Sequence, residues 1–171
     1  MFKIYFIIIA LFFSLQNSFA QTEPIRKNVL YLELAGSGLL YSFNYDRLLV
    51  VDRTLRFSTT LSTWFIPAIE SMSDFNYMVG TSLGFNTLLG TKKHFAELGI
   101  NLAYMSMQDI DDNNFYTFYL PIRMGYRYQK NEGGLFYRVS FMPIIPIIQD
   151  QDVQILYPVT PHFALGIGYS F

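Results

Sequence analysis

Residues 161–171 of this chain read PHFALGIGYSF. Large apolar side chains take every second position of the stretch, and only small or polar residues and one histidine lie between them. The apolar series is Phe163, Leu165, Ile167, Tyr169 and Phe171. Successive side chains of a strand point to opposite faces, so this alternation predicts a β-strand with one apolar face and one small or polar face. A strand of a soluble β-sandwich can show the same alternation.

The same pattern recurs upstream. From residue 28 onward the dominant hydrophobic period is two, and no convincing helical stripe interrupts it, so we expect an all-β fold. Turn-forming residues divide the chain into eight predicted strands. They lie at about residues 28–35, 39–48, 54–65, 75–88, 94–105, 115–128, 135–145 and 161–171. After a tight first turn at residues 36–38, short turns alternate with longer polar loops, as in an antiparallel up-and-down barrel.

The predicted strand at residues 115–128 is the most informative. One face is aromatic at both ends and aliphatic in the middle, as expected for a wall that crosses two membrane interfaces and a hydrocarbon core. This face carries Tyr116, Phe118, Leu120, Ile122, Met124, Tyr126 and Tyr128. Pro121 falls on the other face and cannot donate to the ladder, so we expect a bulge there.

In these patterns, and in a last strand that finishes on Phe171, the chain resembles the small outer-membrane β-barrels of Gram-negative bacteria, the class of the OmpA transmembrane domain and OmpX. The resemblance implies an eight-stranded transmembrane β-barrel in the cell outer membrane, with short turns facing the periplasm. It also implies that the alternate apolar residues of 163–171 are the signal read by the barrel-assembly machinery. Outer-membrane lipid, including lipopolysaccharide, and this machinery are the expected partners.

The first twenty residues have the layout of a secretory signal peptide. Lys3 supplies the positive start, residues 4–15 are an apolar run, and Ser18 and Ala20 are small residues at the positions that a signal peptidase inspects. We expect a signal peptide at residues 1–20, a short periplasmic segment at 21–27 and the barrel at 28–171. The alternative is an N-terminal membrane anchor, although the run is short for a transmembrane helix.

The composition narrows the class further. Of the 171 residues, 51% are hydrophobic and 18% aromatic, but only 15% are charged. This hydrophobic content is high for a soluble protein and low for a helical membrane protein. The formal net charge of −1 comes with no basic patch, so nucleic acid is not an expected partner. The absence of Cys excludes a disulfide scaffold, a thiol nucleophile and a lipidated cysteine.

The face opposite the apolar one is rich in Gly, Ser and Asn, includes Trp64 and Tyr119, and carries seven ionisable side chains. These are Glu33, Asp46, Arg56, Glu97, Arg123, Arg127 and Arg138. Eight strands leave an interior that side chains can fill, and opposite charges in a low-dielectric interior should pair. We therefore predict a filled, ion-paired lumen, as the OmpA resemblance also implies. The alternatives are a narrow small-solute pore or proton path, and a soluble lipocalin-like barrel, in which the faces would be inverted.

Signals for catalysis or metal binding are weak, and we assign no catalytic, cofactor or metal residue. His94 falls in a predicted periplasmic turn. His162 is expected on the inner face, where Thr160 and Ser62 could approach it, so the alternative function is a lipid A-modifying hydrolase or acyltransferase. The acidic stretch at residues 109–114 could collect Ca²⁺, but it lacks the Gly and distal Glu of an EF-hand loop.

The expected role is that of a structural or interaction protein, which offers the loops after the third, fifth and seventh predicted strands to an extracellular or envelope partner. Residues 143–156 are unusually apolar for a loop. We expect a loop at residues 147–156, and the segment could also extend the sheet or present a docking edge.

Overall fold

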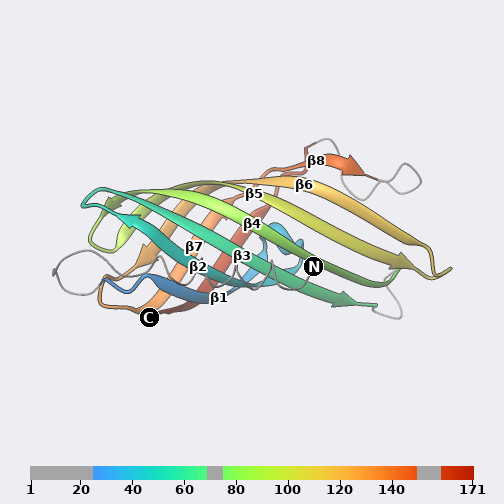
Figure 1. Cartoon of the computed structure of the whole chain (residues 1–171), viewed down its shortest axis with the longest axis horizontal. Coiled ribbons are helices and arrows are strands. Elements are labelled where there is room, and N and C mark those ends of the chain that lie inside the picture. The colour runs from blue at the N-terminus through green and yellow to red at the C-terminus, as the bar shows by residue number, and fades with distance from the viewer. Residues whose placement is uncertain (1–24, 69–74, 150–158) are drawn as a thin grey trace, which may run out of the picture.

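A computed structural model of the chain describes residues 25–68, 75–149 and 159–171 (Figure 1). The predicted signal peptide at 1–20 lies outside the described residues. The elements are β1 (Asn28–Ala35), a short 3-10 helix η1 (Gly36–Gly38), β2 (Tyr41–Val51), β3 (Leu55–Pro67), β4 (Phe75–Thr91), β5 (His94–Asp109), β6 (Asn114–Gln129), β7 (Gly134–Phe141), β8 (Ile144–Gln149) and β9 (Phe163–Ser170). No helix in these described ranges is long and apolar enough to cross a membrane.

The strands form one closed antiparallel sheet. Its order is β5-β4-β3-β2-β1-β9-β7-β6, and a further pairing of β6 with β5 closes the ring. β7 and β8 lie end to end along β6 in one register, because Met124 faces Phe141 and Pro121 faces Ile144. The two therefore make a single wall strand, and the described residues form an eight-stranded up-and-down barrel. The predicted fold class is confirmed.

The barrel has two unlike ends. The turn end, on the left in Figure 1, holds the three short turns that join β2 to β3, β4 to β5 and β6 to β7. The loop end holds the other connections. β4 has 17 residues whereas β1 and β9 have 8 each, so β3 to β6 extend past their neighbours at the loop end. This overhang is visible on the right of Figure 1.

Burial follows the predicted period of two. In β4, for example, Leu83 and Phe85 are exposed on the outer wall, whereas Ser82 and Asn86 are buried. The alternation arises because neighbouring side chains of a strand point to opposite faces of the sheet. The outer wall is consequently apolar, and the polar face lines the lumen.

The seventh wall strand differs from its prediction. The structure continues strand pairing beyond residue 145, through β8 as far as Gln149, so the loop predicted from residue 147 is wrong at its start. Regular strand pairing does stop between Phe141 and Ile144, around Pro143, but it resumes in β8. Pro146 does not end it, because the described partner of β8 beyond Ile144 is β6 alone, and an edge strand tolerates proline. Residues 150–156 of the predicted loop lie outside the described residues.

The prediction of a bulge at Pro121 is also wrong. β5 and β6 keep one register on both sides of it, from Ile100 opposite Ile122 to Ala103 opposite Tyr119. The side-chain amide of Asn101 donates to the carbonyl of Pro121 at 3.4 Å, which compensates locally for the interrupted ladder. The irregularity lies nearby, between Phe118 and Tyr119 where β6 pairs with β8.

The predicted tight turn at residues 36–38 is the helix η1, and its three residues are buried. η1 packs against β1, β2, β3, β4 and β9, so it lies inside the barrel and not beyond its rim. Gly36 has φ +70°, and a Cβ there would lie 2.3 Å from a carboxylate oxygen of Glu33. Only glycine fits this position without strain.

Candidate functional site: the ion-paired lumen

Six of the seven predicted ionisable side chains meet in the middle of the lumen. This network consists of Glu33, Asp46, Glu97, Arg123, Arg127 and Arg138, and each of their side chains is at most 2% exposed. Arg123 binds Glu33 through two parallel hydrogen bonds of 2.7 and 3.0 Å. Such a bidentate pair is the strongest geometry available to these groups.

Arg138 is the centre of the network because it reaches all three carboxylates. Its guanidinium nitrogens lie 2.9 Å from Glu97, 3.5 Å from Asp46 and 4.0 Å from Glu33. It also donates to the hydroxyl of Tyr31 at 2.6 Å and lies over the ring of that residue. The rings of Tyr31 and Phe136 pack against each other beside it, which holds the guanidinium in place.

Asp46 connects the charges to the hydroxyl groups of β3. One carboxylate oxygen accepts a 2.7 Å hydrogen bond from Arg127, and the other accepts hydrogen bonds from Ser58 and Thr60 at 3.0 and 2.7 Å. Arg127 also donates to Gln129, at 2.6 Å from one terminal nitrogen and at 3.0 Å from Nε. The strands that supply these groups lie on different sides of the barrel, so the bonds tie opposite walls together.

The network is electrically balanced, since it contains three carboxylates and three guanidinium groups. Arg56 stands apart from it. Its guanidinium donates to the side chain of Asn131 at 2.9 Å and lies 4.4 Å from the centre of the Phe95 ring. Among the described residues Arg56 has no carboxylate within salt-bridge distance. The expectation that it joins the ion pairs is therefore not met.

Comparison with models of known protein families finds no family that matches this chain, and comparison with curated proteins finds no similar sequence.

The loop end of the lumen is filled differently from its middle. A loop-end cluster of buried apolar side chains occupies it, made up of Trp64, Ile66, Ala103, Met105, Tyr119 and Ile144. The Tyr119 hydroxyl donates to the carbonyl of Ser37 in η1 at 2.6 Å, across the barrel. The period of two in the sequence puts Trp64 and Tyr119 on the inner face, but it does not predict that they form a core.

The two histidines do not form a catalytic arrangement with the described residues. No hydrogen bond joins His162 to Thr160 or Ser62, and Nδ1 of His162 has no partner. His94 is exposed at the turn end, where its Nδ1 lies 2.6 Å from the hydroxyl of Tyr126. The alternative of a hydrolase or acyltransferase gains no support from this geometry.

The acidic loop after β5 closes on itself. One carboxylate oxygen of Asp109 accepts from the backbone amides of Asp111 and Asn113 at 2.9 and 2.8 Å, and the other accepts from the Asn113 side chain at 3.0 Å. These hydrogen bonds hold the pKa of the exposed Asp109 carboxyl below its ordinary value. In the described ranges no group of three His, Asp or Glu side chains is arranged to hold a metal ion.

The predicted assembly residues lie on the outer face of β9 and its end. The exposed fraction of each of these side chains is between 44% and 71%; they are Phe163, Leu165, Ile167, Tyr169 and Phe171. β9 pairs with β1 on one side and with β7 on the other, so these side chains lie over the seam where the barrel closes.

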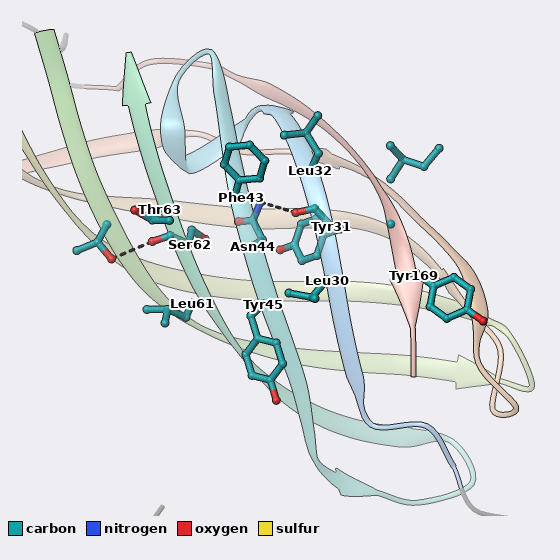
Figure 2. A pocket seen from close by; sticks show the side chains of 13 residues that line it. Leu30, Tyr31, Leu32, Phe43, Asn44, Tyr45, Leu61, Ser62, Thr63 and Tyr169 are labelled. Atoms are coloured by element: carbon teal, nitrogen blue, oxygen red, sulfur yellow. Dashed lines mark hydrogen bonds between the residues drawn. The ribbon is translucent and has the colours of Figure 1, made fainter. Parts of the chain in front are cut away.

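The outer wall is hollowed beside this seam. The hollow runs over β9, β1, β2 and β3 and is lined largely by apolar side chains (Figure 2). Its lining includes the large apolar side chains of Leu30, Leu32, Phe43, Tyr45 and Leu61. A water-facing surface seldom exposes so many large apolar groups together.

Proposed function

We propose that this protein is an outer-membrane β-barrel of a Gram-negative bacterium, with a plugged lumen and a structural or interaction role through its loop end. The observation that carries the proposal is the inversion of the usual arrangement of side chains. Leu83, Phe163 and Ile167, for example, are more than 60% exposed, whereas six charged side chains are buried inside. A hydrocarbon solvent favours this arrangement, because apolar surface is costly in water.

The exposed aromatic groups are sorted along the barrel axis, as a bilayer requires. At the loop end Phe65 packs on Tyr77, Tyr104 on Phe118, and Phe141 on Phe163. At the turn end Phe57 stacks on Phe85, and Tyr128 stacks on Tyr137 at 4.6 Å. Aliphatic residues such as Leu61 and Leu83, which face each other across β3 and β4, occupy the band between these pairs. Two aromatic girdles around an aliphatic band match the interfaces and core of a membrane.

Three hydroxyl groups on the outer face of β3 and β4 have hydrogen-bond partners. Thr59 donates to the carbonyl of Gly84 at 3.0 Å, Thr63 to that of Gly80 at 3.2 Å, and Thr81 to that of Ser62 at 2.8 Å. An unpaired hydroxyl in hydrocarbon would cost several kcal/mol, on the order of 4 to 8. Pairing with the neighbouring strand removes this cost and supports a wall that faces lipid.

The balanced ionic network supports a plugged lumen rather than a conducting pore. A conducting path through the middle of the lumen would have to break ion pairs that are held at 2.7 to 2.9 Å by fully buried partners. We propose no catalytic step, cofactor or metal. The loops at the loop end would then offer a contact surface for an extracellular or envelope protein.

The proposal is tested by fractionating cells that make the full chain and running the membrane fractions unboiled and boiled on gels. We expect the protein in the outer-membrane fraction, with an unboiled band that migrates differently from the boiled one. Leu165→Pro should abolish the shift because it interrupts β9 between its two partner strands, whereas Leu165→Val should keep it. A single unshifted band in the soluble periplasmic fraction would overturn the proposal.

The role of the last strand in assembly needs a separate test. We expect Phe171→Ala to lower the amount of protein in the outer membrane, while the purified variant still folds into lipid vesicles as fast as the wild type. Equal outer-membrane levels for both proteins would show that Phe171 is not read by the assembly machinery.

Two measurements separate the plug from its alternatives. Reconstituted in a planar bilayer, the protein should show no steady conductance, and a sustained ion current would establish a pore instead. Lipid A extracted from cells with the wild type or with His162→Ala should be identical, and a difference between the two would establish a lipid-modifying enzyme.

A further inference from the structure

The charged side chains outside the lumen are divided between the two ends of the barrel. At the turn end they are mostly basic, and the bases are Arg26, Lys27, Arg47, Arg53, Lys92, Lys93 and Lys130, against the acids Asp52 and Glu132. At the loop end the described charged residues are Asp109, Asp111 and Asp112, with no Lys or Arg. Among the described residues the barrel therefore carries a basic collar, the seven bases named above, at one end only.

The basic collar lies next to the aromatic girdle of the turn end. On β2, Arg47 follows Tyr45 on the outer face, and both donate to the side chain of Asn28, at 3.1 and 2.8 Å. On the opposite side of the barrel, the ammonium group of Lys93 lies 5.6 Å from the centre of the Tyr128 ring. Each of these cations is thus held at the level where an apolar wall gives way to polar surroundings.

We infer that the basic collar binds the anionic headgroups of phospholipids in the leaflet around the turn end. The inference rests on the proposed membrane function. A phosphodiester at this level would meet Lys or Arg nitrogens. The acyl chains of the same lipid would lie along the apolar outer wall. Basic side chains beside a membrane attract anionic lipid through this combination of charge and position.

The shape of the collar favours lipid over a single docked protein. Its members come from the start of β1, from β2 and from all three turns, so they surround the barrel instead of forming one patch. Arg26, Lys27, Arg53, Lys92 and Lys93 are exposed. Lipids surround a barrel in the same way, and each headgroup can bind one part of the ring.

Native mass spectrometry on the full-chain product purified from membranes tests the inference. The protein is incubated at low ionic strength with equal amounts of phosphatidylglycerol and phosphatidylcholine that have the same acyl chains. We expect preferential retention of phosphatidylglycerol. Lys92→Gln with Lys93→Gln should weaken it by about five-fold per removed charge, and Arg53→Gln should act in the same direction. The preference should decrease as salt is added.

The matched control removes two charges at the other end. Asp111→Asn with Asp112→Asn should leave the preference for phosphatidylglycerol unchanged. Equal retention of both lipids by the wild type, or an equal loss in this control, would overturn the inference. Displacement of the lipid by an equal concentration of inorganic phosphate would also overturn it, because the collar would then bind soluble phosphate.

Failure of the inference can be distinguished from failure of the proposed function. Each sample is also run unboiled on a gel. A barrel that shows the heat-dependent shift but has no lipid preference contradicts the lipid-binding role of the collar alone. A wild type that shows no heat-dependent shift with either lipid contradicts the membrane function itself.

Discussion

In the middle of the lumen six charged side chains pair with one another, whereas at the loop end the interior is filled by residues such as Trp64, Met105 and Ile144. Both regions are buried and both join opposite walls. Charges lose much of their attraction to desolvation, so an ion-paired layer adds little net stability but is costly to break. Apolar burial adds stability directly. The middle of the lumen thus specifies which walls face each other, and the loop end contributes net stability.

The largest expected effect comes from removing the centre of the network. Arg138→Met leaves three buried carboxylates with two arginines, and we expect a loss of about 3–5 kcal/mol in the free energy of unfolding. Urea unfolding of the protein in lipid vesicles measures it. Arg53→Met, at an exposed turn, is the control and should change little in vesicles of phosphatidylcholine alone, which hold no anionic lipid. A loss below about 1 kcal/mol would show that the charges are not desolvated as the structure implies.

A smaller effect is expected from crowding the loop-end cluster. A Cβ at Gly80 would lie 2.2 Å from the ring of Trp64, so Gly80→Ala should destabilise the barrel by about 1–3 kcal/mol. The same substitution in a Trp64→Leu background should cost less, because the ring is gone. Equal costs in the two backgrounds would mean that Gly80 is needed for its backbone and not for the fit of Trp64.

Replacing a whole ion pair tests how much net stability the charges in the middle of the lumen contribute. Arg123→Met and Glu33→Leu together remove one charge of each sign, so we expect a net change within about 1 kcal/mol, although each single substitution should cost about 3–5 kcal/mol. Denaturant unfolding of all four proteins closes the cycle. Additive losses would contradict the view that the middle of the lumen contributes specificity more than stability.

The smallest effect concerns pH at the loop end. Partial burial lowers the pKa of His162 below its ordinary value, so the folded protein favours the neutral ring. Below the unfolded pKa of about 6.5 the unfolded chain then binds more protons, and stability should fall as the pH drops from 7 toward 5. His162→Gln should show a shallower fall than the wild type over this range. Parallel curves for the two proteins would rule out this contribution.

The sequence predicts which side chains point into the lumen, but it does not predict which of them pair, and the reason is physical. Period two is a local property, so the inward position of Glu33, Trp64 and Arg138 can be read from their neighbours in the sequence. The pairing is not local, and Arg56 shows the consequence, because its inward position is correct but it lies beyond the reach of the carboxylates. Pro146 was misleading for a related reason, since the effect of a proline on strand pairing depends on whether a second partner strand is present.

The sequence by itself determined the all-β class, the wall strands, the apolar and polar faces and the set of charges inside, because each follows from alternation along a strand. Only the tertiary structure decided that Arg138 meets Glu33, Asp46 and Glu97, that η1 folds into the lumen, and that Tyr119 reaches Ser37 across it. Contacts across the lumen join residues far apart in the sequence, for example Arg138 and Tyr31, which are 107 positions apart. They depend on the stagger and length of the strands, which set the level of each side chain in the closed barrel.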